Sequence, residues 1–161
     1  MAGVKIADAH AAGVLDAHTA AAYQLLERRN PDAVPGMFQE TLEPLRCATH
    51  LAVAANDLLS SASPAAGKVL LEALQRPRLA HSTLSPSGHF RVHYDTEGRE
   101  AVEAVDVNLN GIPDYVDATA DIADSMWALE IDSLGYRAPP SDGDAGGGSE
   151  TDIYILDLGR T

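Results

Sequence analysis

Apolar side chains in the first part of the chain recur every three or four positions, which is the spacing of one helix face. In residues 16–29 this stripe consists of Ala20, Tyr23 and Leu26, with Ala22 and Leu25 beside it. Asp16 belongs to the residue types that cap helix N-termini, and Asn30-Pro31 interrupts the pattern. The sequence therefore predicts a helix that Asp16 caps and that ends at Arg29.

Two further helices are expected after a turn-rich link that contains Pro31, Pro35 and Gly36. Thr49 is a candidate cap for the first, whose apolar residues are Leu51, Ala54, Leu58 and Leu59. Ser63-Pro64 opens the second, with a cap and an N1 proline in their preferred order. Its apolar residues are Leu70, Leu71 and Leu74, and Pro77 ends it. Residues 1–80 are thus predicted to form a helical N-terminal region.

The hydrophobic period changes between residues 78 and 88. Residues 89–94 alternate between polar and apolar side chains, which predicts a strand with Phe90, Val92 and Tyr94 facing the core. Residues 113–134 then return to helical spacing, and Gly135 ends the pattern. This helix has one stripe of Tyr115, Ile122, Met126 and Leu129 and a second of Val116, Ala123, Trp127 and Ile131. So wide an apolar face predicts packing on a sheet.

Residues 151–158 are predicted to be a strand that is apolar on both faces, with Ile153 and Ile155 against Tyr154, Leu156 and Leu158. A strand covered on both sides is expected in the middle of a sheet. Together with residues 89–94 and the helix between them, it fits a βαβ unit. We therefore expect an α+β protein with two regions, a helical one at 1–80 and a small α/β one at 81–161.

Charge excludes some partners. The chain has 24 acidic against 11 basic residues and a net charge of −13. The resulting negative potential repels phosphate backbones and anionic lipid, so we expect neither nucleic acid nor membrane as a partner. An acidic excess also serves solubility or a saline habitat, so charge alone assigns no function.

The sequence gives no sign of targeting or of disulfide chemistry. It has no basic segment followed by an apolar run at its N-terminus and no long apolar run elsewhere, so it predicts neither a signal peptide nor a spanning helix. Cys47 is the single cysteine and is expected to be a small buried apolar residue.

Residues 106–117 match a calcium-binding loop of the EF-hand kind. Such loops place oxygen ligands at positions 1, 3, 5, 7, 9 and 12 and a glycine at position 6. The corresponding ligands are Asp106, Asn108, Asn110, the carbonyl of Ile112, Asp114 and Asp117. Gly111 occupies the turn. Carboxylate, amide and carbonyl oxygens are the ligands that Ca²⁺ prefers, so calcium is the expected cofactor.

Two departures from the EF-hand pattern bear on this loop. Position 12 is Asp117 where a longer, bidentate glutamate is usual, which predicts weaker binding or a tighter loop. No entering helix precedes Asp106, so the pattern is a loop followed by one helix, as in dockerin-like modules. Such an ion locks a turn and does not act as a switch. The alternative is a hydrogen-bonded Asp/Asn turn that binds nothing.

Other polar groups carry weaker signals. His89 and His93 lie four residues apart, but on a strand that spacing is roughly 13 Å, too far to share one zinc ion. His81 is a third candidate whose geometry nothing sets. Acidic residues surround the glycine-rich segment at Asp142, Asp144, Glu150 and Asp152. They predict either a solvated flexible loop, which is the commoner meaning, or a second calcium site.

The motifs taken together carry a resemblance. The run SPSGHFRVHYDT, the loop DVNLNGIPDYVD, the segment IDSLGYRAPP, the loop DGDAGGG and TDIYILDLG occur in that order. In this order they resemble the N-terminal half of a family of secreted bacterial zinc metalloproteases. The resemblance implies a helical candidate pro-segment followed by a partial zincin-like α/β unit of strand, calcium loop, long helix and strand. It also implies an extracellular or cell-surface location.

In that family a His-Glu-x-x-His helix further along holds zinc, and its glutamate is the general base. This chain contains no His-Glu pair, so zinc is expected only in longer relatives and this chain is not expected to hydrolyse peptides. Three interpretations follow: a calcium-stabilised front portion of a metallopeptidase-like protein, a stand-alone calcium-binding or interaction module, or an inhibitory pro-segment with Cys47 capping zinc. Expected partners are calcium, a missing catalytic half, or a second copy paired through the final strand.

Overall fold

The computed structural model describes residues 5–39, 49–141 and 143–157. The described part contains five α-helices and one three-stranded sheet, which confirms the predicted α+β class. Contacts group the chain into two compact units that divide between Arg76 and Pro77. The first unit is helical, and the second contains the sheet and the candidate calcium loop.

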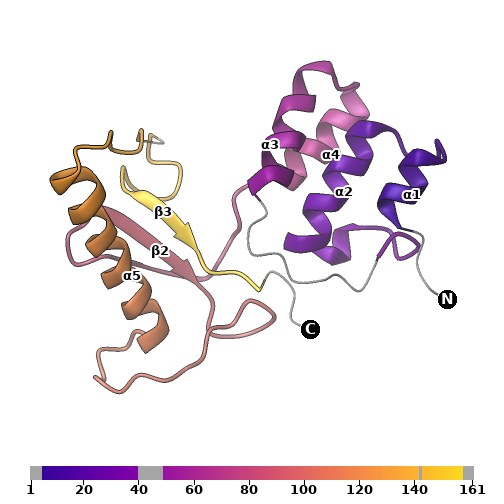
Figure 1. Ribbon diagram of the computed structural model, residues 1–161. Coiled ribbons are helices and arrows are strands. Elements are labelled where there is room, and N and C mark those ends of the chain that lie inside the picture. The colour runs from indigo at the N-terminus through magenta and orange to yellow at the C-terminus, as the bar shows by residue number, and fades with distance from the viewer. Residues whose placement is uncertain (1–4, 40–48, 142, 158–161) are drawn as a thin grey trace. The chain divides into compact units, whose positions relative to one another are not determined.

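The helical unit is built from α1 (Ile6–Ala11), α2 (Ala17–Arg29), α3 (Thr49–Leu58) and α4 (Pro64–Leu74). Short 3₁₀ turns, Pro31–Ala33 and Leu59–Ser61, follow α2 and α3. Helix α2 packs against both α3 and α4, as the indigo to pink ribbons show (Figure 1). Leu25 of α2, Val34 and Leu70 of α4 are fully buried at the centre of this unit.

The predicted start signals of two helices are confirmed. Asp16 caps α2, and its carboxylate accepts hydrogen bonds from the N–H groups of His18 and Thr19 at 2.9 and 3.0 Å. Ser63 caps α4, where its hydroxyl accepts from the N–H of Ala66 at 3.3 Å and Pro64 is the first helical residue. The side chain thus replaces the partner that a first-turn N–H lacks within its own helix.

The sheet of the second unit contains β1 (His81–Leu84), β2 (Phe90–Tyr94) and β3 (Thr151–Tyr154), in the order β1-β2-β3. Strand β2 pairs antiparallel with β1 and parallel with β3, and helix α5 (Asp114–Trp127) connects β2 to β3. The predicted βαβ unit is therefore confirmed. Strand β1 was not predicted, because its residues are short of apolar side chains and mostly exposed.

Two expectations about β3 are wrong. Strand β3, which ends at Tyr154, lies at an edge of the described sheet instead of its middle. The strand also has a polar face, since Asp152 lies on the same side as Tyr154 and faces β2 side chains. Leu158, which was expected to belong to the strand, lies outside the described residues.

Helix α5 packs on the sheet, and Val116 is the one member of its two predicted stripes that is buried. Val116 and Ala120 are buried against Val92 and Tyr94, as expected for packing on a sheet. The other stripe, Tyr115, Ile122, Met126 and Leu129, is exposed, with values of 60, 64, 44 and 47%. Figure 1 shows α5 in orange lying along one side of β2 and β3. The predicted packing of this helix on a sheet is therefore confirmed, and part of its apolar face is left exposed.

Helix α5 continues into a π-helical segment, Ala128–Ser133, before the chain turns at Gly135 with a φ of +73°. The positive φ is the conformation for which glycine was expected at this helix end. Within the described residues, none of the helices combines the length and the apolar character that a membrane crossing needs.

Candidate metal centre

The candidate calcium loop lies between β2 and α5 and is attached to the core at its C-terminal end. The side chain of Ile112 packs against the buried cluster of Val92, Tyr94, Val116 and Ala120. The N–H of Asp114 donates to the carbonyl of Val105 at 2.7 Å, which closes the loop across its base. Movement of the loop is thereby coupled to the packing of β2 against α5.

The backbone turns sharply at two positions of the loop. Gly111 has a φ of +84°, and Leu109 has a φ of +58°. The left-handed region is natural for glycine, whereas for leucine it costs about 1 kcal/mol and needs support from its surroundings. That support comes from Asp106, whose carboxylate accepts from the N–H groups of Asn110 and Gly111 at 3.2 and 2.8 Å.

The remaining polar side chains of the loop form hydrogen bonds with one another or with the loop backbone. Asp117 Oδ2 accepts from the side-chain amides of Asn108 and Asn110, at 3.0 and 2.8 Å. Asp114 accepts from the N–H of Val107 at 3.1 Å. Hydrogen bonds therefore link Asp106, Asn108, Asn110 and Asp117 to one another, whereas Asp114 is bonded to the backbone of Val107.

In this conformation the carboxylates accept hydrogen bonds from the loop and do not converge on one point. No three His, Cys, Asp or Glu side chains in the described ranges gather closely enough to hold a metal ion. The side-chain oxygens of Asn108 and Asn110 accept from the N–H groups of Asn110 and Ile112, while their NH₂ groups face Asp117. A half-turn of each amide exchanges its nitrogen and oxygen and presents two oxygens beside that carboxylate. The donor types are those that a hard cation prefers, but the three carboxylates would also have to move together to bind one ion.

The charged side chains of the loop and its neighbouring segments all have the same sign. Every charged residue between Arg99 and Arg137 is acidic, so no basic side chain of this segment balances Asp106, Asp114 and Asp117. Burial raises the pKa of Tyr94, and the nearby charge of Asp117 raises it further. The phenol of β2 therefore lies close enough to the loop to sense the charge at its last position.

The three histidines considered for zinc have separate surroundings. His89 stacks on Trp127 with ring centroids 4.1 Å apart, and His81 stacks on Tyr94 at 5.5 Å. His93 stacks on Tyr154 at 4.4 Å and donates from Nε2 to Asp152 at 2.8 Å. Each ring thus contributes to packing or to a hydrogen bond within the α/β unit.

The acidic residues around the glycine-rich segment that the structure describes do not gather into a second site. Asp152 pairs with His93, and Glu150 forms an ion pair with Arg91 at 2.9 Å, so both carboxylates turn toward β2. Asp144 is exposed with a φ of +72°. Asp142 and Cys47 lie outside the described residues.

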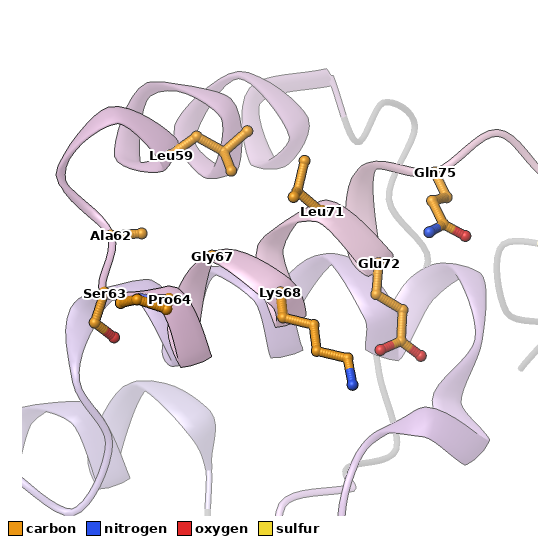
Figure 2. A pocket seen from close by; sticks show the side chains of 9 residues that line it. All are labelled: Leu59, Ala62, Ser63, Pro64, Gly67, Lys68, Leu71, Glu72 and Gln75. Carbon is orange, nitrogen blue, oxygen red and sulfur yellow. The ribbon is translucent and has the colours of Figure 1, made fainter.

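The helical unit has a shallow pocket with a volume of about 670 Å³. It is lined by Leu59, Ala62, Ser63, Pro64, Gly67, Lys68, Leu71, Glu72 and Gln75. Figure 2 shows Leu59 and Leu71 pointing into the space beside α4, while Lys68 and Glu72 extend along the outside of the helix. The pocket is mixed in character, with one basic and one acidic side chain, and gathers no reactive groups.

One connection between α5 and the sheet was missed from the sequence. Asp124 of α5 accepts from the N–H and the hydroxyl of Ser87, in the turn between β1 and β2. Burial acts to raise the pKa of Asp124, but these hydrogen bonds outweigh it and hold that pKa below its usual value. The pair adds a second tie between the sheet and α5. Only the composition of the SPSG turn, rich in side chains that donate, could have signalled it.

The candidate centre is thus defined by residues of β2, the loop and the first turn of α5. Comparison with protein-family models, with curated proteins and with solved structures gave no match for this chain.

Proposed function

We propose that this chain is a calcium-stabilised front portion of a metallopeptidase-like protein, in which Ca²⁺ bound at residues 106–117 fastens β2 to α5. The observation that supports the calcium site best is that hydrogen bonds join Asp106, Asn108, Asn110 and Asp117 around one tight turn, with Asp114 bonded to the backbone of the same loop. These five side chains, with the carbonyl of Ile112, supply the six oxygens that a calcium site requires as a minimum.

Chemistry favours calcium over other ions at this loop. Histidine and cysteine, the usual zinc ligands, are absent from residues 106–117. Mg²⁺ demands near-ideal octahedral geometry, whereas Ca²⁺ tolerates the irregular arrangement that a short flexible turn provides. Three carboxylates also offset the cost of removing water from a divalent cation.

The ion would act by fixing the two ends of the loop. The Ile112 side chain and Val116 both belong to the core that packs α5 on β2. Since the unfolded chain cannot assemble the ligands, binding stabilises the folded state by about 2.7 kcal/mol at a free calcium concentration one hundred times the Kd. It also removes the repulsion among three carboxylates that no local base balances.

The metallopeptidase part of the proposal is supported by the order of motifs across the chain and by the βαβ unit that connects β2, α5 and β3. In a longer protein, this unit would provide the scaffold beside which a zinc-binding helix is placed. This chain's own residues contribute structure and not catalysis, because no His-Glu pair is present in the sequence.

Calorimetry with two charge-matched variants tests the calcium proposal. We expect Ca²⁺ to raise the thermal midpoint of the wild-type protein and to do so progressively with concentration. The double variant Asp106→Asn/Asp117→Asn should lose most of this rise, because two of the three carboxylate ligands are removed. The control Glu97→Gln/Glu103→Gln removes the same charge from exposed positions nearby and should keep the full rise.

A midpoint that does not move with millimolar Ca²⁺, or that moves equally in both double variants, would contradict the calcium site. The catalytic part has its own readout, since purified chain with added Zn²⁺ should not cleave a casein substrate. Cleavage that depends on zinc would show that a catalytic centre had been overlooked.

A further inference from the structure

The α5 stripe, defined as Tyr115, Ile122, Met126 and Leu129, is an apolar surface that the described α/β unit does not cover. All four side chains are at least 44% exposed. Tyr115, Ile122 and Met126 lie on α5 and Leu129 on the π-helical segment that continues it, whereas Val116 and Ala120 of α5 pack on β2. Isolated exposed apolar residues are normal, but four in line on one helix are typical of a docking surface.

The spacing of the stripe suits a partner helix. Tyr115, Ile122 and Leu129 are each seven residues apart, and Met126 fills the turn between the last two. A seven-residue repeat keeps the same edge of a helix facing a second helix that runs alongside it. The stripe is also long and narrow, which is the shape of a helix-in-groove or helix-pair contact.

Charge identifies the kind of helix that fits. Acidic residues accompany the stripe, with Asp114 and Asp121 immediately before two of its members and Glu130 and Asp132 just after Leu129. Asp121, Glu130 and Asp132 are exposed. No lysine, arginine or histidine occurs between Arg99 and Arg137, so a partner meets acidic groups alone on this surface.

The same charge argues against a second copy as the occupant. Pairing two α5 helices through their stripes would bring two acidic borders together, and like charges directly opposite one another are destabilising. The net charge of −13 adds long-range repulsion between copies at low salt. If the partner instead has basic residues beside its apolar face, the local and the long-range electrostatic interactions both become attractive.

We propose that the α5 stripe binds a cationic amphipathic helix of another polypeptide, with its apolar residues against Ile122 and Met126 and its lysine or arginine residues against Asp121, Glu130 and Asp132. The proposal goes beyond the calcium function, because none of Ile122, Met126, Asp121, Glu130 or Asp132 belongs to the loop. Binding is therefore expected both with calcium and with a chelator present.

The probe is a fluorescein-labelled 18-residue peptide of leucine and lysine, arranged so that all leucines share one helix face. Fluorescence anisotropy is measured against the full chain, with a scrambled peptide of the same composition and with a peptide in which glutamate replaces lysine. We expect the amphipathic lysine peptide to bind at least tenfold more tightly than either control, and added salt to weaken it.

Matched variants localise the contact. Ile122→Gln/Met126→Gln should weaken peptide binding at least tenfold, whereas Val53→Gln/Leu71→Gln, which changes equally exposed apolar residues of the helical unit, should leave it unchanged. Asp121→Asn/Asp132→Asn should weaken it several-fold and reduce its salt dependence. All replaced side chains are exposed, so an unchanged thermal midpoint verifies that each variant folds.

Three outcomes would overturn the proposal. The first is equal binding of the amphipathic and scrambled peptides, which would mean charge attraction without a helix site. The second is equal binding by the wild type and Ile122→Gln/Met126→Gln. The third is dimerisation in analytical ultracentrifugation that this double variant abolishes, which would make a second copy the occupant. Loss of calcium binding in the loop variants, by contrast, leaves the peptide result unaffected.

Discussion

At the scale of single residues, Asp16 shows how one side chain can stabilise a helix in a pH-dependent way. Its carboxylate accepts hydrogen bonds from the hydroxyl and the N–H of Thr19 and from the N–H of His18. These bonds, chiefly the one from the Thr19 hydroxyl, lower the pKa of Asp16 from 3.8 to about 2. The ionised form is therefore favoured in the folded state.

We expect Asp16→Ala to lower the free energy of unfolding by about 1 kcal/mol at pH 7, the usual cost of losing an N-cap. Because the folded pKa is the lower one, the contribution of the charge is complete above pH 3.8 and is lost as the pH falls toward 2. The difference between the wild type and Asp16→Ala should thus shrink between about pH 4 and pH 2. Urea unfolding at several pH values measures it.

The matched replacement is Asp16→Asn, which keeps a capping oxygen but cannot ionise. The free energy of unfolding of Asp16→Asn should be close to that of the wild type at pH 7. It should lack the pH dependence that ionisation of Asp16 gives the wild type. If Asp16→Asn and Asp16→Ala were equally destabilised, the capping geometry would not be the source of the effect.

At the scale of secondary-structure elements, β3 is held to β2 by one ion pair and one side-chain hydrogen bond as well as by backbone pairing. Arg91 and His93 of β2 contact Glu150 and Asp152, in a register that places Arg91 beside Asp152 and His93 beside Tyr154. The His93 and Asp152 side chains are only 12 and 4% exposed. A hydrogen bond to a charged group in such a place is worth about 1.5–3 kcal/mol.

Replacing His93 by phenylalanine separates stacking from hydrogen bonding. His93→Phe keeps an aromatic ring beside Tyr154 but removes the donor to Asp152, so we expect the free energy of unfolding to fall by about 2 kcal/mol. His89→Phe keeps the stack on Trp127 and is the control, with an expected change of less than about 0.5 kcal/mol. Chemical denaturation followed by Trp127 fluorescence measures both. Equal losses in the two variants would argue against the Asp152 hydrogen bond as the cause.

Elements differ in how far the sequence predicts them, and the reason is the origin of their stability. The caps Asp16 and Ser63 act on their own first turn, so residue type and position suffice to find them. Strand β1 depends on its pairing with β2, and its polar residues carry no pattern of their own. Exposure of Ile122 and Met126 likewise depends on what packs beside α5, which periodicity cannot tell.

In the candidate site, too, the sequence predicts the features that are encoded locally but not those that depend on tertiary contacts. Ligand types and the glycine of the turn are encoded locally in residues 106–117, so the loop was recognisable. The pairing of Asp152 with His93 and of Glu150 with Arg91 joins residues 59 apart in sequence. Those carboxylates were expected in a solvated loop or a second calcium site, because their partners are brought near only by the parallel β2–β3 register.

At the scale of the whole molecule, the division into two compact units predicts that calcium acts on one of them. Hydrogen exchange should slow in β2, in residues 106–117 and in α5 when Ca²⁺ is added. Exchange in α2 and α4 should stay unchanged, because their core contains none of the loop residues. Mass spectrometry of peptic fragments measures this difference.

The calcium-loop variant Asp106→Asn/Asp117→Asn is the control for the exchange experiment and should show no slowing anywhere. Equal slowing in both units of the wild type would mean that they unfold as one cooperative body. In that case, the local contribution of the ion would have to be measured from subglobal opening at low denaturant.

The glycine-rich segment before β3 has an unexpected consequence for how the protein tolerates mutation. A Cβ atom on Gly146 or Gly148 would overlap the carboxylates of Asp152 and Glu150, whereas Gly143 has open space around it. Gly146 and Gly148 thus leave space for the carboxylates of Asp152 and Glu150. Library selection should therefore accept alanine poorly at 146, where the Asp152 carboxylate is held by His93, and at 143, where φ is +69°, although a run of glycines is normally taken for a spacer of arbitrary composition.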